Sequence, residues 1–228
     1  MLRSVVADRY SGKGASGLLL AGLLAFTTSA PAMPAAPATP AAQTILVLGD
    51  SLSAAHNIAT DQGWVHLLQD RLGEMGSPTK DSSWQVVNAS ISGETSLSGK
   101  QRLPALLAKL HPQVVVIELG ANDGLRGLPL PGLRENLAAM ITDAQRAHAR
   151  VLLLGIELPL NYGPQYRDGL RAVYAELATT RHVALVPFLL QGVATDPRVM
   201  QDDGLHPTAA GEPQVLDTVW SKLKPMLR

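Results

Sequence analysis

Three polar side chains have the types that serine-based acyl transfer requires. Ser51 lies in the tetrapeptide Gly49-Asp50-Ser51-Leu52, and Asp203 precedes His206 near the other end of the chain. A serine hydroxyl becomes a strong nucleophile only when a base takes its proton, and an imidazole is the natural base near neutral pH. A carboxylate one turn away can accept a hydrogen bond from the other ring nitrogen and fix the imidazole tautomer. These residues therefore predict a Ser-His-Asp nucleophilic site.

The segments that must position these side chains alternate between strand-like and helix-like patterns. Short apolar runs without polar alternation predict strands, and apolar residues at helical spacing predict helices. The predicted strands cover residues 45–48, 84–88, 114–117, 151–154 and 183–186. The predicted helices include residues 64–72, 103–110, 133–147, 170–177 and 215–227. A helix is also expected to begin where the first strand ends, at Ser51.

The alternation predicts an α/β domain over residues 43–228. Strands that are apolar on both faces must be covered on both sides, so the sheet is expected to be parallel. Right-handed crossovers then give a doubly wound, flavodoxin-like three-layer α/β/α sandwich with a five-stranded parallel sheet. Ligands of such sheets bind at the carboxyl ends of the strands. The polar segments expected at that edge are 49–52, 88–95, 120–123 and 202–207.

The first 42 residues do not fit the domain pattern. Arg3, Arg9 and Lys13 precede an apolar stretch, residues 18–26, and Ala30-Pro31-Ala32 fits a cleavage site. This layout predicts a signal peptide over residues 1–32, and the apolar stretch is short for a membrane anchor or span. Prolines at every third position from 31 to 40 predict an extended Ala/Pro-rich spacer over residues 33–42. We therefore expect a periplasmic or secreted protein with no membrane span after cleavage.

Composition excludes several other classes of protein. The chain has no cysteine, which removes disulfides, thiolate nucleophiles and Cys-ligated metal centres. Its 19 basic and 19 acidic side chains and 4% aromatic content are not typical of a nucleic-acid binder. The remaining histidines lack the spacing of metal ligands. We expect no metal, no cofactor and no nucleic-acid partner, and a monomer acting on a small acyl ester or lipid-derived substrate.

The four polar segments, in this order, resemble the four blocks of the SGNH (GDSL) hydrolase family, named for residues that correspond here to Ser51, Gly93, Asn122 and His206. The resemblance covers residues 43–228 and implies the SGNH hydrolase type of fold. It implies that Ser51, Asp203 and His206 are catalytic. It also implies an oxyanion hole made of the backbone N–H groups of Ser51 and Gly93 and the side-chain amide of Asn122. Such donors stabilise the charge of a tetrahedral intermediate.

The resemblance implies hydrolysis of carboxylic esters or thioesters, of the arylesterase, acyl-CoA thioesterase or lysophospholipase kind. Apolar residues near the expected edge could line a groove for an acyl chain. We single out Leu125, Leu158, Leu160 and Tyr162 as substrate-binding candidates, although any one of these side chains could instead pack beneath the loops.

Each motif alone also has a structural explanation. Asp50 or Ser51 could cap a helix, and Gly93 could be an ordinary turn glycine. Four motifs in order, each at the end of a predicted strand, favour catalysis. Two other functions remain open: a carbohydrate O-acetyl esterase with the same four segments, and a non-catalytic binding module on the same fold.

Overall fold

Five parallel strands form the sheet that the sequence predicts. In the computed structural model, which describes residues 43–75 and 83–227, the sheet has the order β2-β1-β3-β4-β5. The strands are β1 (Gln43–Gly49), β2 (Trp84–Asn88), β3 (Val114–Glu118), β4 (Arg150–Leu154) and β5 (Ala184–Val186). The expected signal peptide and spacer lie outside the described residues.

The register places β1 between β2 and β3. Ile45 pairs with Val86 on one side and with Val114 on the other. The order reverses between β1 and β3, since the chain runs outward from β1 to β2 and then returns to β3. Such a reversal opens a crevice at the carboxyl ends of the two strands. Gly49 and Glu118, the last residues of β1 and β3, therefore lie side by side beneath the expected site.

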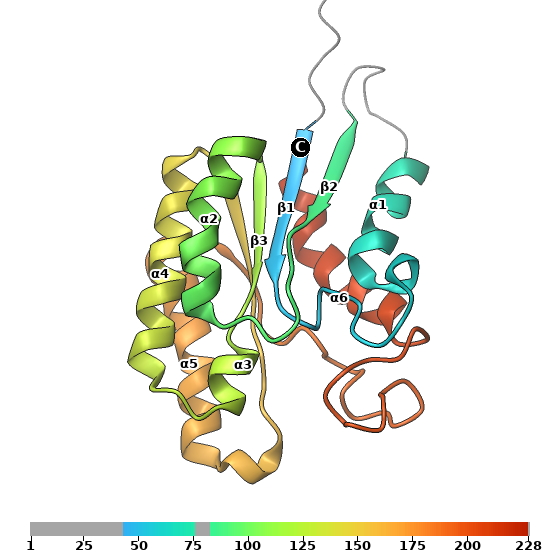
Figure 1. The fold of residues 1–228 in the computed structure, drawn as a ribbon, viewed down its shortest axis with the longest axis vertical. Coiled ribbons are helices and arrows are strands. Elements are labelled where there is room, and N and C mark those ends of the chain that lie inside the picture. Colours follow the sequence, from blue (N-terminus) through green and yellow to red (C-terminus); the bar gives the residue numbers. More distant parts are fainter. Residues whose placement is uncertain (1–42, 76–82, 228) are drawn as a thin grey trace, which may run out of the picture. The chain divides into compact units, whose positions relative to one another are not determined.

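Helices cover both faces of the sheet (Figure 1). The face with α2, α4 and α5 lies opposite the face with α1 and α6. The bounds are α1 (Trp64–Glu74), α2 (Ser96–Leu110), α3 (Ala121–Leu125), α4 (Leu130–Arg146), α5 (Pro164–Arg181) and α6 (Glu212–Leu223). Short 3-10 turns are η1 (Thr60–Gln62), η2 (Leu160–Tyr162) and η3 (Lys224–Met226). The described residues thus form the predicted three-layer sandwich.

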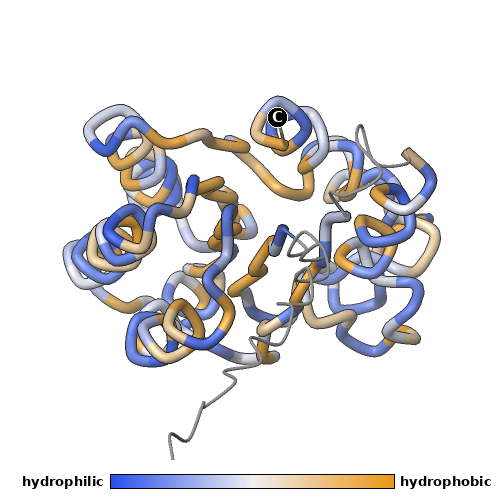
Figure 2. The backbone as a smooth tube through the Cα atoms, turned by 90° about the horizontal axis from the view of Figure 1, so that it is seen from above, coloured by the Kyte–Doolittle hydropathy of each residue, from blue (hydrophilic) through white to orange (hydrophobic). Residues whose placement is uncertain are grey.

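The core explains why the strands read as unbroken apolar runs. All five residues of β3 and the run Ile45–Leu48 of β1 are buried. Figure 2 shows apolar segments gathered toward the middle of the fold, with hydrophilic segments more toward the outside. Burial on both faces favours β-branched and aliphatic side chains without alternation. Among residues 43–75 and 83–227, every helix is too short or too polar to cross a membrane.

The expectation of a helix at Ser51 is wrong. A series of turns occupies residues 51–57, and the next helical segment is η1 at Thr60. Asp50 explains the difference, because its Oδ1 accepts the backbone N–H of Leu52 (3.1 Å) and its carbonyl accepts those of Ser53 and Ala54. The Asp50 side chain thus satisfies a local turn instead of capping a helix.

A buried carboxyl group joins helices α1 and α6. The N-cap residue of α1, Gly63, supplies no side-chain acceptor, and Glu212 at the start of α6 accepts the backbone N–H of Trp64 instead (2.9 Å). Burial raises the pKa of Glu212 from its ordinary 4.5 to about 7, against the lowering effect of the Trp64 hydrogen bond. The folded protein therefore holds this proton more tightly than the unfolded chain.

Glu212→Gln keeps an oxygen acceptor for Trp64 but has no carboxyl proton to lose. We therefore expect the variant to gain stability relative to wild type as pH rises. A raised carboxyl pKa favours folding below the unfolded pKa, and the advantage is lost as pH rises toward 7. We expect the variant's stability relative to wild type to increase by roughly 3 kcal/mol between pH 4.5 and pH 8. Urea unfolding at both pH values measures this difference. An equal difference at the two pH values contradicts the prediction.

Candidate active site

The structure brings Ser51, His206 and Asp203 into one hydrogen-bonded chain. Ser51 Oγ lies 2.8 Å from His206 Nε2, although 155 positions separate the two residues. His206 Nδ1 lies 2.7 Å from Asp203 Oδ2. These distances fit proton transfer from the hydroxyl to the imidazole, with the carboxylate fixing the tautomer. The arrangement can therefore generate a serine nucleophile.

The carboxylate of Asp203 holds the loop that carries His206. Asp203 Oδ1 accepts the backbone N–H groups of Leu205 (2.9 Å) and His206 (3.1 Å), which leaves Oδ2 for the ring. Partial burial raises the pKa of Asp203, but these hydrogen bonds and the imidazole outweigh it, so the pKa lies below its usual value. The Met200–Pro207 bridge closes the base of the loop. Asp203 is thus ionised where it faces His206.

Ser51 is placed by a close approach of β1 to β3. A Cβ at Gly49 would lie 2.7 Å from Glu118 Oε2 and 2.9 Å from the Ser53 side chain, so only glycine fits. The turn that Asp50 organises then presents Ser51 half-buried at the sheet edge. The sequence Gly-Asp-Ser is therefore explained by packing, turn formation and chemistry in that order.

The expected oxyanion donors differ in whether they already donate a hydrogen bond within the protein. Within residues 43–75 and 83–227, the backbone N–H groups of Ser51 and Gly93 have no acceptor. Gly93 has φ +81°, a left-handed conformation that favours glycine. The amide of Asn122 donates to Asp50 Oδ2 and to the carbonyl of Glu94, each at 3.0 Å. An oxyanion would have to compete with these acceptors for Asn122.

Neighbouring residues brace the segments that carry Gly93 and Asn122. Asp123, in the first turn of α3, accepts the backbone N–H (2.8 Å) and hydroxyl (2.6 Å) of Ser96 at the start of α2. Arg126 donates to the carbonyl of Gly93 (3.0 Å). These contacts join α3 to the residues that precede α2, so the candidate donors are held in a fixed relation.

Replacement of Asn122 by alanine tests its role as a donor. We expect Asn122→Ala to lower kcat by roughly 10²–10³-fold, as the loss of one oxyanion donor typically does. The effect should fall on kcat more than on KM, since the donor acts on charge that develops in the transition state. Steady-state hydrolysis of a p-nitrophenyl ester, with thermal unfolding as a check of folding, measures it. A folded variant with wild-type kcat removes Asn122 from the site.

A buried acid pair supports the turn below Ser51. The carboxyl groups of Asp50 and Glu118 lie near each other, and Glu118 Oε2 accepts the Asp50 N–H (3.1 Å) and the Ser53 hydroxyl (2.9 Å). Burial raises the pKa of Asp50 to about 6, while burial and the nearby Asp50 charge raise the pKa of Glu118 well above its usual value. Glu118 Oε1 is buried without a partner among the described residues. A proton on Glu118 removes the repulsion between two buried carboxylates.

Glutamine should therefore replace Glu118 far better than alanine does. Glu118→Gln keeps an oxygen that can accept from the Asp50 N–H and the Ser53 hydroxyl, and it is neutral like a protonated glutamate, so stability and kcat are expected to stay close to wild type. Glu118→Ala leaves two buried donors unsatisfied beside a new cavity, and we expect a loss of about 2–4 kcal/mol. Urea unfolding of both variants at pH 7 compares them. Equal destabilisation by glutamine and alanine contradicts a protonated Glu118.

A cavity of about 90 Å³ opens beside Ser51. Its polar lining comes from Ser51, Asn122, Glu157 and His206. Its apolar lining comes from Leu52, Leu125, Ile156, Leu158, Phe188, Leu190 and Leu205, among others. The structure thus places two of the four substrate-binding candidates, Leu125 and Leu158, in this cavity.

The other two candidates, Leu160 and Tyr162, lie apart from the cavity lining. Leu160 in η2 is 80% exposed. Tyr162 donates its hydroxyl to the carbonyl of Leu125 (3.0 Å) and lines a separate hollow with Leu130. Sequence reasoning missed Phe188 and Leu190, which follow β5. The same strand-end rule that located Ser51 could have found them.

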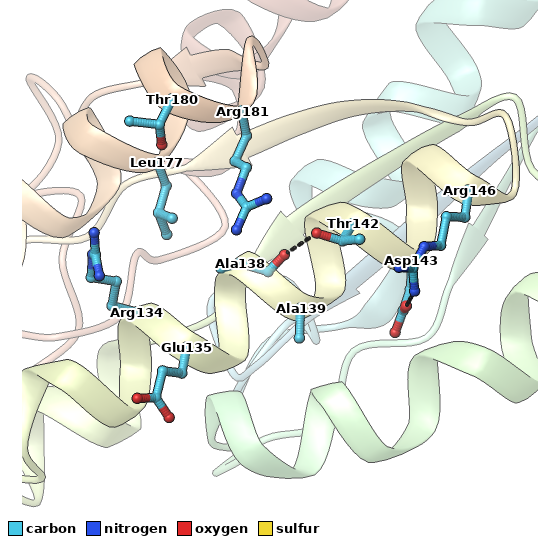
Figure 3. A pocket seen from close by; sticks show the side chains of 10 residues that line it. All are labelled: Arg134, Glu135, Ala138, Ala139, Thr142, Asp143, Arg146, Leu177, Thr180 and Arg181. Atoms are coloured by element: carbon cyan, nitrogen blue, oxygen red, sulfur yellow. Dashed lines mark hydrogen bonds and ion pairs between the residues drawn. The ribbon is translucent and has the colours of Figure 1, made fainter.

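A further hollow lies between α4 and α5, away from the strand ends (Figure 3). Arginines from both helices line it, together with Ala138, Ala139 and Leu177. Arg134 pairs with Glu176 and Arg146 with Asp143, so acidic groups accompany two of the arginines. It shares no lining residue with the cavity at Ser51. Ser51, Asn122 and His206 therefore line the cavity at Ser51 and not this hollow.

Comparison with known proteins gives consistent matches over this region. The model of the GDSL-like Lipase/Acylhydrolase family matches residues 47–212. Esterase TesA of Pseudomonas aeruginosa is 54% identical over 187 residues, which cover 82% of this chain and 90% of that protein. Thioesterase 1/protease 1/lysophospholipase L1 of Escherichia coli K12 is 42% identical over 187 residues, with coverages of 82% and 86%.

A solved structure gives the same picture. The crystal structure of the psychrotrophic esterase EstA from Pseudoalteromonas sp., inhibited by monoethylphosphonate, superposes with a TM-score of 0.75 at 39% identity. The match covers 81% of this chain and 98% of that one. The region matched by the family model contains Ser51, Gly93, Asn122 and His206.

Proposed function

Since the chain belongs to the GDSL-like lipase/acylhydrolase family and is an ester hydrolase, we propose that it works through an acyl-enzyme on Ser51. One observation carries the proposal: the chain of contacts from Ser51 Oγ to His206 Nε2 (2.8 Å) and from His206 Nδ1 to Asp203 Oδ2 (2.7 Å). The phosphonate inhibition of the EstA structure supports it, because phosphonates mimic the tetrahedral intermediate of acyl transfer.

In the proposed first half-reaction, His206 Nε2 takes the proton of Ser51 as Oγ attacks the ester carbonyl. The carbonyl oxygen becomes an oxyanion that accepts hydrogen bonds from Ser51, Gly93 and Asn122. Collapse of the intermediate breaks the bond to the leaving alcohol or thiol, which receives the proton from Nε2. In the second half-reaction, His206 deprotonates a water molecule that attacks the acyl-enzyme. Release of the carboxylic acid restores Ser51.

The cavity suggests which part of the substrate is enclosed. A cavity of about 90 Å³ is small, so it encloses a short acyl segment beside Ser51. A longer chain must continue toward solvent along the sheet edge. We propose acyl esters and thioesters as substrates, in agreement with the names of the relatives. The same volume also admits an acetyl group, so a carbohydrate O-acetyl esterase remains the second candidate.

A panel of p-nitrophenyl esters from acetate to laurate separates these candidates. We expect hydrolysis to extend beyond acetate, because Leu125 and Leu158 offer an apolar surface to additional methylene groups. Strict preference for acetate, together with release of acetate from acetylated carbohydrate, favours the second candidate.

A fluorophosphonate probe tests the acyl-enzyme directly. We expect wild-type protein to be labelled on the peptide that contains Ser51, whereas Ser51→Ala is not labelled. Ser221→Ala, which removes an exposed hydroxyl from α6, should be labelled like wild type. Heat-denatured wild type should not react, since the hydroxyl is activated only in the folded site. A folded, unlabelled wild-type protein contradicts a serine nucleophile and favours a binding module.

We also propose that the hydrolase works outside the cytoplasm. The basic residues and apolar stretch of segment 1–32 support this location, although they lie outside the described residues. Mass spectrometry of the protein recovered from periplasm and medium should find an N-terminus just after Ala32. Recovery of intact Met1 in the cytoplasm contradicts export.

A further inference from the structure

A second histidine, His56, lies against the ring of His206. The ring centroids of His56 and His206 are 4.3 Å apart, with the ring planes tilted by 37°. One ligand atom from each of His56, Asp203 and His206 lies within 4.8 Å of the others. His56 is half-buried at this edge and comes from the turns after β1, far in sequence from the His206 loop. The fold therefore assembles two imidazoles and a carboxylate from two separate segments.

The position of His56 is fixed by its surroundings. Its neighbours Ala55 and Asn57 have φ values of +55° and +57°, a left-handed conformation that residues with a Cβ rarely adopt. The side-chain amide of Gln201 donates to the carbonyl of His56 (2.9 Å) and to that of Pro207 (2.7 Å). The backbone N–H of Gln201 also donates to the carbonyl of His206 (2.8 Å). Gln201 thus fastens the His56 turn to the His206 loop.

The proposed ester hydrolysis does not use this second imidazole. Both ring nitrogens of His206 already have partners, Ser51 on one side and Asp203 on the other. His56 is therefore an additional nitrogen ligand beside a site that is complete without it. Two imidazoles and a carboxylate, with a fourth position open to water, are a typical ligand set for Zn²⁺.

We propose that His56, Asp203 and His206 bind a divalent transition-metal ion of the Zn²⁺ class, and that the bound ion inhibits the hydrolase reversibly. Tetrahedral Zn²⁺ holds nitrogen and oxygen ligands about 3.4 Å apart. The ion must therefore draw the widest pair together by at most about 1.4 Å, through rotation of side chains that are only partly buried. A coordinated His206 or Asp203 can no longer serve the Ser51 proton transfer. The inhibition rests on the proposed function, whereas the binding does not.

Inhibition can be measured on the full-length wild-type protein with p-nitrophenyl butyrate in buffers of defined free Zn²⁺. We expect the rate to fall as Zn²⁺ rises and to return on addition of EDTA. His56→Phe keeps an aromatic ring against His206 but removes the ligand, and His56→Gln is a second variant in case the first misfolds. Each should need about tenfold more Zn²⁺, or higher, for half-inhibition, relative to its own metal-free rate.

His66→Phe provides the matched control. His66 is exposed on α1, with Nε2 3.7 Å from Asp70, so it pairs an imidazole with a carboxylate elsewhere on the surface. This variant should be inhibited like wild type. Equal Zn²⁺ sensitivity of wild type and both His56 variants overturns the proposal, as does a wild-type protein that millimolar Zn²⁺ leaves uninhibited.

Direct binding separates this inference from the proposed function. Ser51→Ala retains all three ligands, and Co²⁺ bound to it in near-tetrahedral geometry should give strong visible absorption that saturates at one equivalent. The absorption should be lost in Ser51→Ala/His56→Phe. If the absorption depends on His56 but the wild-type protein has no esterase activity, the metal site is supported and the proposed function fails. Esterase activity without such absorption overturns the metal site alone.

Discussion

Ser51→Ala and His206→Ala are each expected to lower kcat by about 10⁶-fold, and the double variant should be no slower than either single variant. The reason is the 2.8 Å contact between Ser51 Oγ and His206 Nε2. Without the base the hydroxyl stays protonated, and without the hydroxyl the base has no nucleophile to activate. Residual hydrolysis then comes from the oxyanion donors and substrate positioning, which both variants retain. Steady-state kinetics on the three purified proteins measure the losses.

The control for this prediction is His148→Ala. His148 is an exposed residue just before β4, outside the cavity lining, and its loss should leave kcat unchanged. Losses for Ser51→Ala and His206→Ala that multiply in the double variant would show two independent contributions. That outcome contradicts a shared proton transfer between the two residues.

The parts of the site that the sequence predicts are those that depend on strand ends. Ser51 and Asn122 follow strands with unbroken apolar runs, Gly93 follows the more polar strand β2, and a parallel sheet brings such positions to one edge. The His206 loop arrives there because α6 follows it and must return across the sheet. Sheet topology alone therefore places most of the chemical groups.

Contacts between side chains from different segments could not be predicted in this way. Glu118 follows the predicted strand 114–117 and had no motif of its own, and only the register of β1 against β3 shows that it lies beneath Asp50. His56 had no motif, because its closeness to His206 depends on Gln201 and on two unusual φ values. The missing helix at Ser51 has the same origin, since Asp50 bonds locally and the chain turns. Periodicity carries no information on any of these contacts.

Asp203→Asn is expected to lower kcat by about 10⁴-fold with the fold intact. Asparagine can keep the Oδ1 contacts to the N–H groups of Leu205 and His206, so the loop should retain its shape. Its amide, however, replaces the acceptor Oδ2 that faces His206 Nδ1 with a donor. The ring must then accept at Nδ1 and carry its proton on Nε2, so it cannot take a proton from Ser51. Ester hydrolysis and thermal unfolding measure the two parts of this prediction.

Asp202→Asn is the matched control, because Asp202 is an exposed neighbour that makes no hydrogen bond or ion pair among the described residues. The same loss of one negative charge should leave kcat near wild type there. Comparable losses at positions 202 and 203 would indicate that the general negative charge of the loop matters. A loss confined to Asp203→Asn shows instead that the carboxylate acts through its contact with Nδ1. Asp203→Ala should then hydrolyse ester more slowly than Asp203→Asn and be less stable, since it also removes the acceptor that holds the loop.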